Sequence, residues 1–163
     1  MDDYDIISIT NADEHEYLDK YLDASIIGTR ALSSVLVVGK EAGNGIHVTT
    51  KNISYCTEGM YRNALLTAGI EDADITVAGP FSISGTAALV GAIKAYETMT
   101  GEEIDDENLD AANDELVLTG KLVEDIGDSE KAEDLMALVK QEVAENKLTS
   151  AEDIQNVVDQ ACN

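Results

Sequence analysis

The sequence is poor in basic residues. Lys and Arg number 10 among 163 residues, against 33 Asp and Glu, which gives a formal net charge of −23 at pH 7. A protein that binds nucleic acid without regard to sequence needs Lys and Arg to displace the counterions of the phosphates, so this class is excluded. Direct binding to an anionic membrane surface is disfavoured for the same reason.

Long apolar runs, aromatic residues and cysteines are also scarce. No apolar run approaches the roughly 18 residues that a transmembrane helix needs, and the opening MDDY lacks the basic and apolar parts of a signal peptide. There is no Trp and only one Phe, so the sequence offers few aromatic side chains on which bases or sugars could stack. Cys56 and Cys162 do not form a disulfide framework, and we expect two independent reduced thiols.

What the chain does have is an ordinary apolar share, 44%, which favours a folded globular protein. Its charge is uneven. Residues 1–100 carry 14 acidic and 6 basic side chains, and residues 101–163 carry 19 and 4. This shift predicts an α+β core over 1–100 with a buried closing helix, and an acidic helical layer over 101–163 packed on it as one compact unit.

Residues 1–80 contain alternating signals for strands and helices. Runs of β-branched residues predict strands, and apolar residues three and four apart predict helices. The order is β-α-β-β-α-β, which matches the ferredoxin-like arrangement with a four-stranded antiparallel sheet and both helices on one face. We expect the second and third strands to form a hairpin and the fourth to be buried on both faces. The strands are expected at 4–9, 31–38, 45–53 and 73–78, and the helices at 12–22 and 58–68.

The rest of the chain is predicted to be helical. Gly79-Pro80 is expected to break the fourth strand, and Ser84 can cap a helix that runs to about Thr100. That helix is apolar nearly all round, so it should be buried. No strand signal follows Gly101, and three further helices are expected, which gives an α+β fold with an all-helical C-terminal portion.

The turn GPFSISGT, residues 79–86, is the most suggestive local feature. It joins a strand to a helix N-terminus, where free N–H groups favour anions, and Ser82, Ser84 and Thr86 add hydroxyl donors. It is neither a phosphate-binding P-loop, because no Lys follows, nor a nucleophile elbow. The structural interpretation of this turn is an N-cap with close helix–strand packing at Gly85. The functional interpretation is a binding site for a small ligand.

Arg30 is one of only two arginines and lies at the start of the strand 31–38. It could pair with a carboxylate of this acidic protein or hold an anionic ligand through two hydrogen bonds. The candidate ligand-binding set is therefore Arg30, Ser82, Ser84, Gly85 and Thr86.

No catalytic residue, metal site or cofactor is predicted. Cys56 precedes a helix, which can activate a thiol, and His47 is a conceivable partner, but most free cysteines are inert and buried. The histidines and cysteines form no close pair of the kind that zinc sites use. The acidic stretch 102–115 has Ala111 and Val117 where a calcium loop needs Gly and Glu, so it predicts a solvated helix start, with weak divalent binding left open.

Taken together, several segments resemble the bacterial domain-of-unknown-function family number 1002. The resemblance extends from about residue 4 to the end of the chain, and its GTR and SGTAAL parts are the most specific. The segments are SITNADEHEYL (8–18), IGTRALSS (27–34), TEGMYRNALLTAGI (57–70), PFSISGTAALVGAIKAYE (80–97) and ANDELVLTGKLVEDIG (112–127).

Members of that family are mostly secreted proteins of Gram-positive bacteria that begin with an export signal and a further N-terminal segment. The resemblance therefore implies an extracellular or cell-envelope location, with this chain starting inside the family pattern. It brings no activity, substrate or catalytic residue with it.

Three functional hypotheses follow. The leading one is an exported, non-enzymatic α+β domain that contacts a protein or a cell-envelope component. The alternative is a small anionic-ligand-binding domain or a hydrolase centred on residues 79–86. The third is weak calcium-dependent adhesion through residues 102–115.

Overall fold

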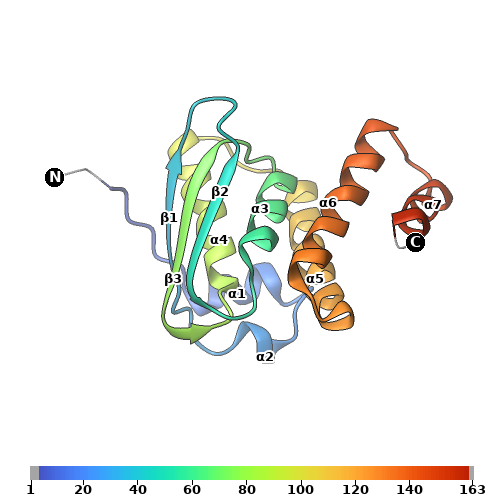
Figure 1. Cartoon of the computed structure of the whole chain (residues 1–163). Helices are drawn as coiled ribbons and strands as arrows, with labels where there is room; N and C mark the ends of the chain where they lie inside the picture. The colour runs from blue at the N-terminus through green and yellow to red at the C-terminus, as the bar shows by residue number, and fades with distance from the viewer. Residues whose placement is uncertain (1–3, 162–163) are drawn as a thin grey trace. The chain divides into compact units, whose positions relative to one another are not determined.

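The computed structural model describes residues 4–161 (Figure 1). The chain divides between Val117 and Leu118 into two compact units, which are treated separately. No helix in the described range is long and apolar enough to cross a membrane. In chain order the elements are α1 (Asn11–Leu18), α2 (Ala24–Ile27), β1 (Ser34–Gly39), β2 (Ile46–Ile53), α3 (Glu58–Thr67), β3 (Ala73–Ile83), α4 (Thr86–Thr100), α5 (Asp106–Ile126), α6 (Ser129–Glu145) and α7 (Ala151–Ala161).

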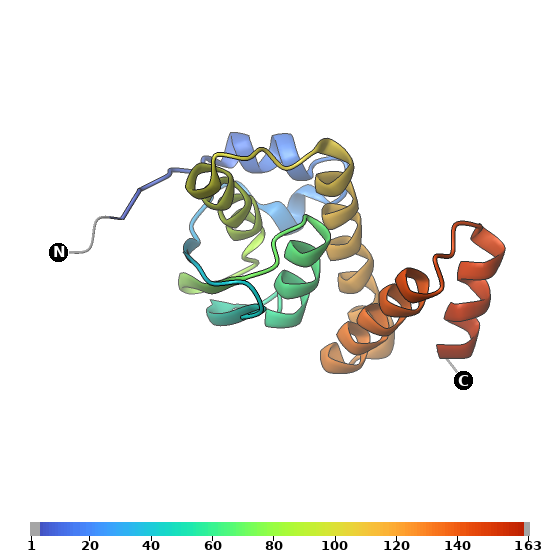
Figure 2. The ribbon, with the colours of Figure 1, turned by 90° about the horizontal axis from the view of Figure 1, so that it is seen from above.

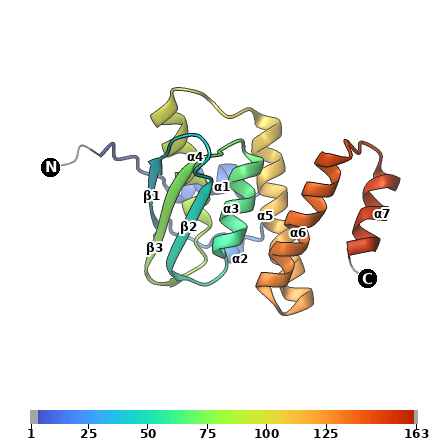
Figure 3. The same ribbon diagram turned by 45° about the horizontal axis from the view of Figure 1, so that its top comes forward.

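The first unit is built on a three-stranded mixed sheet in which β3 lies between β1 and β2 (Figure 3). β3 runs antiparallel to β1 and parallel to β2. The parallel pair follows from connectivity, because α3 carries the chain from the end of β2 back to the start of β3. α4 packs against β1 and α3 against β2, so the helices cover one face of the sheet (Figure 2).

The other face of the sheet is open. Ile75 and Val77 of β3 are buried, whereas Thr76 between them is exposed. Thr76 pairs with Leu36 on β1 and Thr49 on β2, and both of these side chains are exposed too. Successive side chains of a strand point to opposite faces, so a single layer of helices leaves every second residue in solvent. The expectation that this strand is buried on both faces was wrong for that reason.

The α+β class is confirmed, but the ferredoxin-like order is not. Residues 4–9 are extended without joining the sheet, so the sheet has three described strands rather than four, and it is mixed rather than antiparallel. High β-propensity means that a residue fits a pleated, half-buried surface. Residues 4–9 have the residue types of a strand, but most of this segment does not pack against such a surface. Ile6 is 90% exposed, and Ile9 is the residue that packs against the core.

The predicted hairpin between the second and third strands is also absent. β1 and β2 are the two edges of the sheet, with β3 between them. β3 carries the buried Ala73, Ile75 and Val77, the most deeply buried strand residues of the unit, so the central place suits it best.

The start of α4 differs from the expectation as well. β3 continues through Gly79-Pro80 to Ile83, with an irregularity opposite Asn52, and Gly85 rather than Ser84 is the N-cap of α4. Gly85 has a left-handed backbone (φ +88°), and no side chain caps the helix. Glycine reaches this conformation without steric cost.

The core of the first unit lies between the sheet and its helices. α1, α3, α4 and the first half of α5 all contribute fully buried side chains, among them Leu18, Tyr61, Leu65, Leu89, Ile93 and Leu116. Tyr17 also lies 5.0 Å below the Lys94 ammonium group, in a cation–π contact.

The second unit, Leu118–Asn163, contains the end of α5, α6 and α7. Its helices bury few apolar side chains: Ala132 is the buried residue of α6, and α7 buries none. The predicted boundary at Gly101 coincides with the C-cap of α4, and the division into 1–100 and 101–163 stays a prediction. Cys162 lies outside the described residues.

Candidate functional site

The turn between β3 and α4 is tightly packed around Gly85. The Tyr61 hydroxyl donates to the Gly85 carbonyl at 2.5 Å, and the Cys56 amide donates to the Ser84 carbonyl at 3.0 Å. A Cβ on Gly85 would lie 2.6 Å from Ile53 Cγ2 and would also collide with the Tyr61 hydroxyl. The turn is therefore closed by α3 and by the end of β2.

A buried carboxylate from α1 also meets this turn. Glu14 is 1% exposed and accepts from Thr86 Oγ1 at 2.5 Å and from Asn11 Nδ2 at 3.3 Å. Ser84 Oγ lies 3.2 Å from Thr86 Oγ1. The side chain of Glu14 therefore lies beside the first turn of α4, bonded to Thr86.

Glu14 was missed by the sequence analysis. Its signal is its spacing: it lies four residues before Leu18, on the same face of α1, and both side chains are buried. An acidic residue on the apolar face of a helix calls for a buried partner, and Thr86 is that partner.

The structure brings part of the predicted ligand set together. Ser84, Gly85 and Thr86 share the turn, with Ser84 half-buried and the other two buried, whereas Ser82 is exposed at the end of β3. Arg30 is exposed in the segment that leads to β1, and no ion pair of Arg30 occurs within residues 4–161. The ligand-binding role of this set stays a prediction.

Cys56 does not have the surroundings of a reactive thiol. It is buried, and burial raises the pKa of its thiol to about 12, so the thiol is protonated at neutral pH. His47 lies near the opposite end of β2, roughly 20 Å away by the rise of an extended strand, and its Nε2 is 3.0 Å from the Asn44 carbonyl oxygen. The conceivable Cys56/His47 pair is not formed.

The acidic stretch 102–115 enters α5 at Asp106. Asp105 accepts from the amide of Asn108 at 3.0 Å, and Asp110 accepts from the Tyr21 hydroxyl, a bond that raises the pKa of Tyr21 to about 12. Within residues 4–161, no three His, Cys, Asp or Glu side chains gather in a way that could hold a metal ion.

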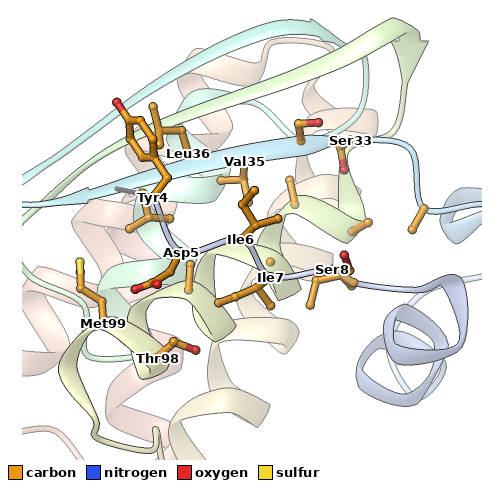
Figure 4. A pocket seen from close by; sticks show the side chains of 18 residues that line it. Tyr4, Asp5, Ile6, Ile7, Ser8, Ser33, Val35, Leu36, Thr98 and Met99 are labelled. Atoms are coloured by element: carbon orange, nitrogen blue, oxygen red, sulfur yellow. The ribbon is translucent and has the colours of Figure 1, made fainter. Parts of the chain in front are cut away.

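A hollow of the first unit lies beside β1. We call it the β1 cleft; it is bounded by residues 4–9, by residues 31–37 including most of β1, and by one face of α4, and its volume is about 630 Å³. Figure 4 shows the chain from Tyr4 to Ser8 passing beside β1, with Thr98 and Met99 at the far end of α4. Among the described residues that line it, none is basic and Asp5 is the one charged residue.

The α4 wall of the β1 cleft consists of small residues. Ala87, Ala88, Gly91 and Ala95 line it. A Cβ on Gly91 would lie 2.9 Å from Val35 Cγ1, so the helix approaches β1 closely at this point.

The rim of the β1 cleft carries apolar side chains in solvent. Ile6 is 90% exposed, Tyr4 63%, Met99 47% and Leu36 44%. At the end of the cleft that precedes β1, Ser33 Oγ is buried and has no hydrogen-bond partner within the described part of the chain. Buried polar atoms are nearly always paired, so this hydroxyl has unused bonding capacity inside the cleft.

Comparison with known proteins decides the family. The whole chain, residues 1–163, matches the model of a family described as "Protein of unknown function (DUF1002)". The chain belongs to the DUF1002 family. The resemblance inferred from its segments is thereby confirmed.

The chain is also similar in sequence to a curated bacterial protein. The chain is 46% identical over 158 residues to the "Uncharacterized protein YpuA" of Bacillus subtilis (strain 168). The alignment covers 96% of this chain and 54% of YpuA, so the chain spans about half the length of that relative. No solved structure matches this DUF1002 chain.

Proposed function

We propose that this DUF1002 domain is an exported, non-enzymatic module that binds a protein or another component of the cell envelope. The observation that carries the proposal is a set of exposed apolar side chains on the first unit. Tyr4, Ile6, Leu36 and Met99 border the β1 cleft, and Val38 extends the set along the open face of the sheet. Exposed apolar patches on otherwise polar proteins mark interaction sites.

The strongly acidic composition strengthens the interpretation of these exposed apolar side chains as an interaction site. With a net charge of −23, the surface as a whole is highly polar, and a cluster of solvent-exposed Leu, Val, Ile and Met is out of keeping with it. Burying such side chains against a partner gains roughly 25 cal/mol per Å² of apolar surface. Association is therefore favoured at the β1 side of the sheet.

The anionic-ligand or hydrolase alternative at residues 79–86 has less support. The Glu14 carboxylate occupies the neighbourhood of Thr86, where it would repel an incoming anion, and the Cys56 thiol is buried. A turnover reaction that is abolished by changing Ser84 or Cys56 would overturn the non-enzymatic proposal.

Site-specific photocrosslinking in the bacterium that produces the protein tests the proposal. A benzoylphenylalanine at Leu36, on the open face of β1, should give a covalent adduct with a polypeptide or envelope polymer in the extracellular or wall fraction. The matched control carries the same group at Thr49, which is exposed on the same face of the sheet but on β2. Equal adducts from both positions, no adduct, or protein confined to the cytoplasm would contradict the proposal.

A further inference from the structure

We infer that the β1 cleft binds an extended, basic peptide segment of a partner protein, which adds to the sheet as a fourth strand along the free edge of β1. This inference rests on the proposed function and names the class of partner. It is carried by four features: an unpaired strand edge, a cleft along it, an unsatisfied hydroxyl within it, and the charge around it.

Within residues 4–161, the outer edge of β1 pairs with no other strand. β1 pairs with β3 on one side, and residues 4–9 on its other side form no ladder with it. Natural proteins blunt such edges with Lys, Pro or bulges. The strand reads Ser-Val-Leu-Val-Val-Gly, with no charged residue, no proline and no register shift against β3. An edge of this composition is a template for another strand.

The β1 cleft provides space for that strand. Its volume of about 630 Å³ falls within the roughly 300–1,000 Å³ typical of ligand sites. On one side, Ala87, Ala88 and Ala95 of α4 present short side chains to the cleft, whereas Gly91 is already in close contact with Val35. On the other, Leu36 and Tyr4 offer exposed apolar surface to its outward side chains.

The hydroxyl of Ser33, next to β1, is available for a further hydrogen bond. Its Oγ is buried, lines the cleft and has no hydrogen-bond partner within residues 4–161. It immediately precedes β1, so a backbone group of a strand that extends past Ser34 would lie within its reach. Leaving such a group unpaired costs free energy of desolvation, which the added strand would recover in part.

The charge around the cleft selects a basic segment. Residues 1–117 carry 22 acidic and 6 basic side chains. The lysines of the two elements that flank the cleft are already paired: Lys40, just after β1, lies 2.7 Å from Asp74, and Lys94 of α4 lies 3.3 Å from Glu97. An acidic peptide would be repelled, whereas lysines on a bound strand would meet a negative potential.

Titration of the ¹⁵N-labelled chain with a synthetic peptide of alternating lysine and valine tests the inference. The expected result is saturable binding, with amide shift changes concentrated in residues 34–38 and 4–8 and slower hydrogen exchange in β1. A fully N-methylated peptide of the same sequence keeps the charge but has no backbone donors, and it should bind at least about tenfold more weakly. A peptide of alternating glutamate and valine should not bind.

Matched variants locate the site. Leu36→Lys places a charge on the edge strand and should weaken peptide binding about tenfold or more, whereas Thr49→Lys makes the same charge change on β2 and should change it less than about twofold. Both positions are exposed, and Val38→Lys serves as a second edge variant should Leu36→Lys alter the melting temperature.

Several results would overturn the inference: no binding, equal binding of the N-methylated peptide, or shift changes confined to the acidic helix α5. If the peptide fails while the Leu36 photocrosslink captures a partner, strand addition is wrong and the proposed function stands. If the peptide adds to β1 while no partner is captured in cells, the proposed function fails instead.

Discussion

Gly85 is the residue on which the junction of β3 and α4 depends. Its left-handed backbone turns the chain into the helix, and its missing side chain leaves room for the Tyr61 hydroxyl and for Ile53. Ser84 was the expected cap because serine is a preferred N-cap residue. The tight approach of α3 and β2 outweighs that preference and moves the cap by one residue.

The substitution Gly85→Ala should lower the free energy of unfolding by about 3 kcal/mol, because it combines left-handed strain with overpacking. Gly101→Ala is the matched control. Gly101 also has a positive φ (+73°), but a Cβ there would meet no atom within 4 Å, so it should cost only about 1 kcal/mol. Urea denaturation of both variants measures the difference, and equal losses would contradict this account of the turn.

His15 links α1 to the turn after α2 through two acceptors. Its Nδ1 lies 2.5 Å from the Asp19 carboxylate and its Nε2 3.1 Å from the Gly28 carbonyl oxygen. The ring can donate to both only when it is doubly protonated. The bond to Asp19, followed by the one to Gly28, raises the pKa of His15 above its ordinary value of 6.5.

Stability should therefore depend on pH through His15. Because the folded-state pKa is the higher one, the stabilisation is fully present below pH 6.5 and is lost as the pH rises through the raised value. Urea unfolding of the wild type and of His15→Gln, measured across this range, should show a gap that narrows with increasing pH. A gap that is constant or widens would contradict the prediction.

At the scale of elements, the contact between α1 and α4 depends on a polar pair inside an apolar layer. Glu14 and Thr86 join the two helices at their buried ends. The same pair puts the protein's own carboxylate beside the N-terminus of α4, the end that sequence analysis considered for a ligand.

The substitution Glu14→Gln should lower the free energy of unfolding by about 1–3 kcal/mol, because an amide donor replaces one acceptor oxygen between the donors of Thr86 and Asn11. Glu16→Gln, exposed on the same helix, should change it by less than about 0.5 kcal/mol. Thermal or urea unfolding measures both. A neutral effect at Glu14 would show that the buried pair contributes nothing to the fold.

Local signals predicted the elements better than they predicted their pairing. Thr57 caps α3, and Gly69, with a positive φ, follows its last turn; both features depend on residue chemistry within a few positions. The role of residues 4–9 and the place of β3 depend on which surface meets which across long stretches of chain. The apolar residues around Ile75 indicate that it is buried but not which strands flank it, so the predicted hairpin and the predicted strand over residues 4–9 were both wrong.

At the scale of the whole molecule, the acidic excess and the β1 cleft belong to different parts of the sequence. The acidic excess is greatest after residue 100, whereas the apolar exposure around β1 belongs to the first unit. The composition of the chain predicted which large partners are disfavoured. It gave no sign of the β1 cleft, because the cleft exists only through the approach of residues 4–9, β1 and α4, which are distant in sequence.

The central claim is that the outer edge of β1 is free. Native-state amide hydrogen exchange, followed residue by residue over 34–39, tests it most directly. Successive amides of an edge strand point alternately toward β3 and toward solvent. With a free outer edge, protected and rapidly exchanging amides should alternate along β1. Uniform protection of these amides, together with protection of residues 4–9, would mean that the edge is already paired, and would contradict it.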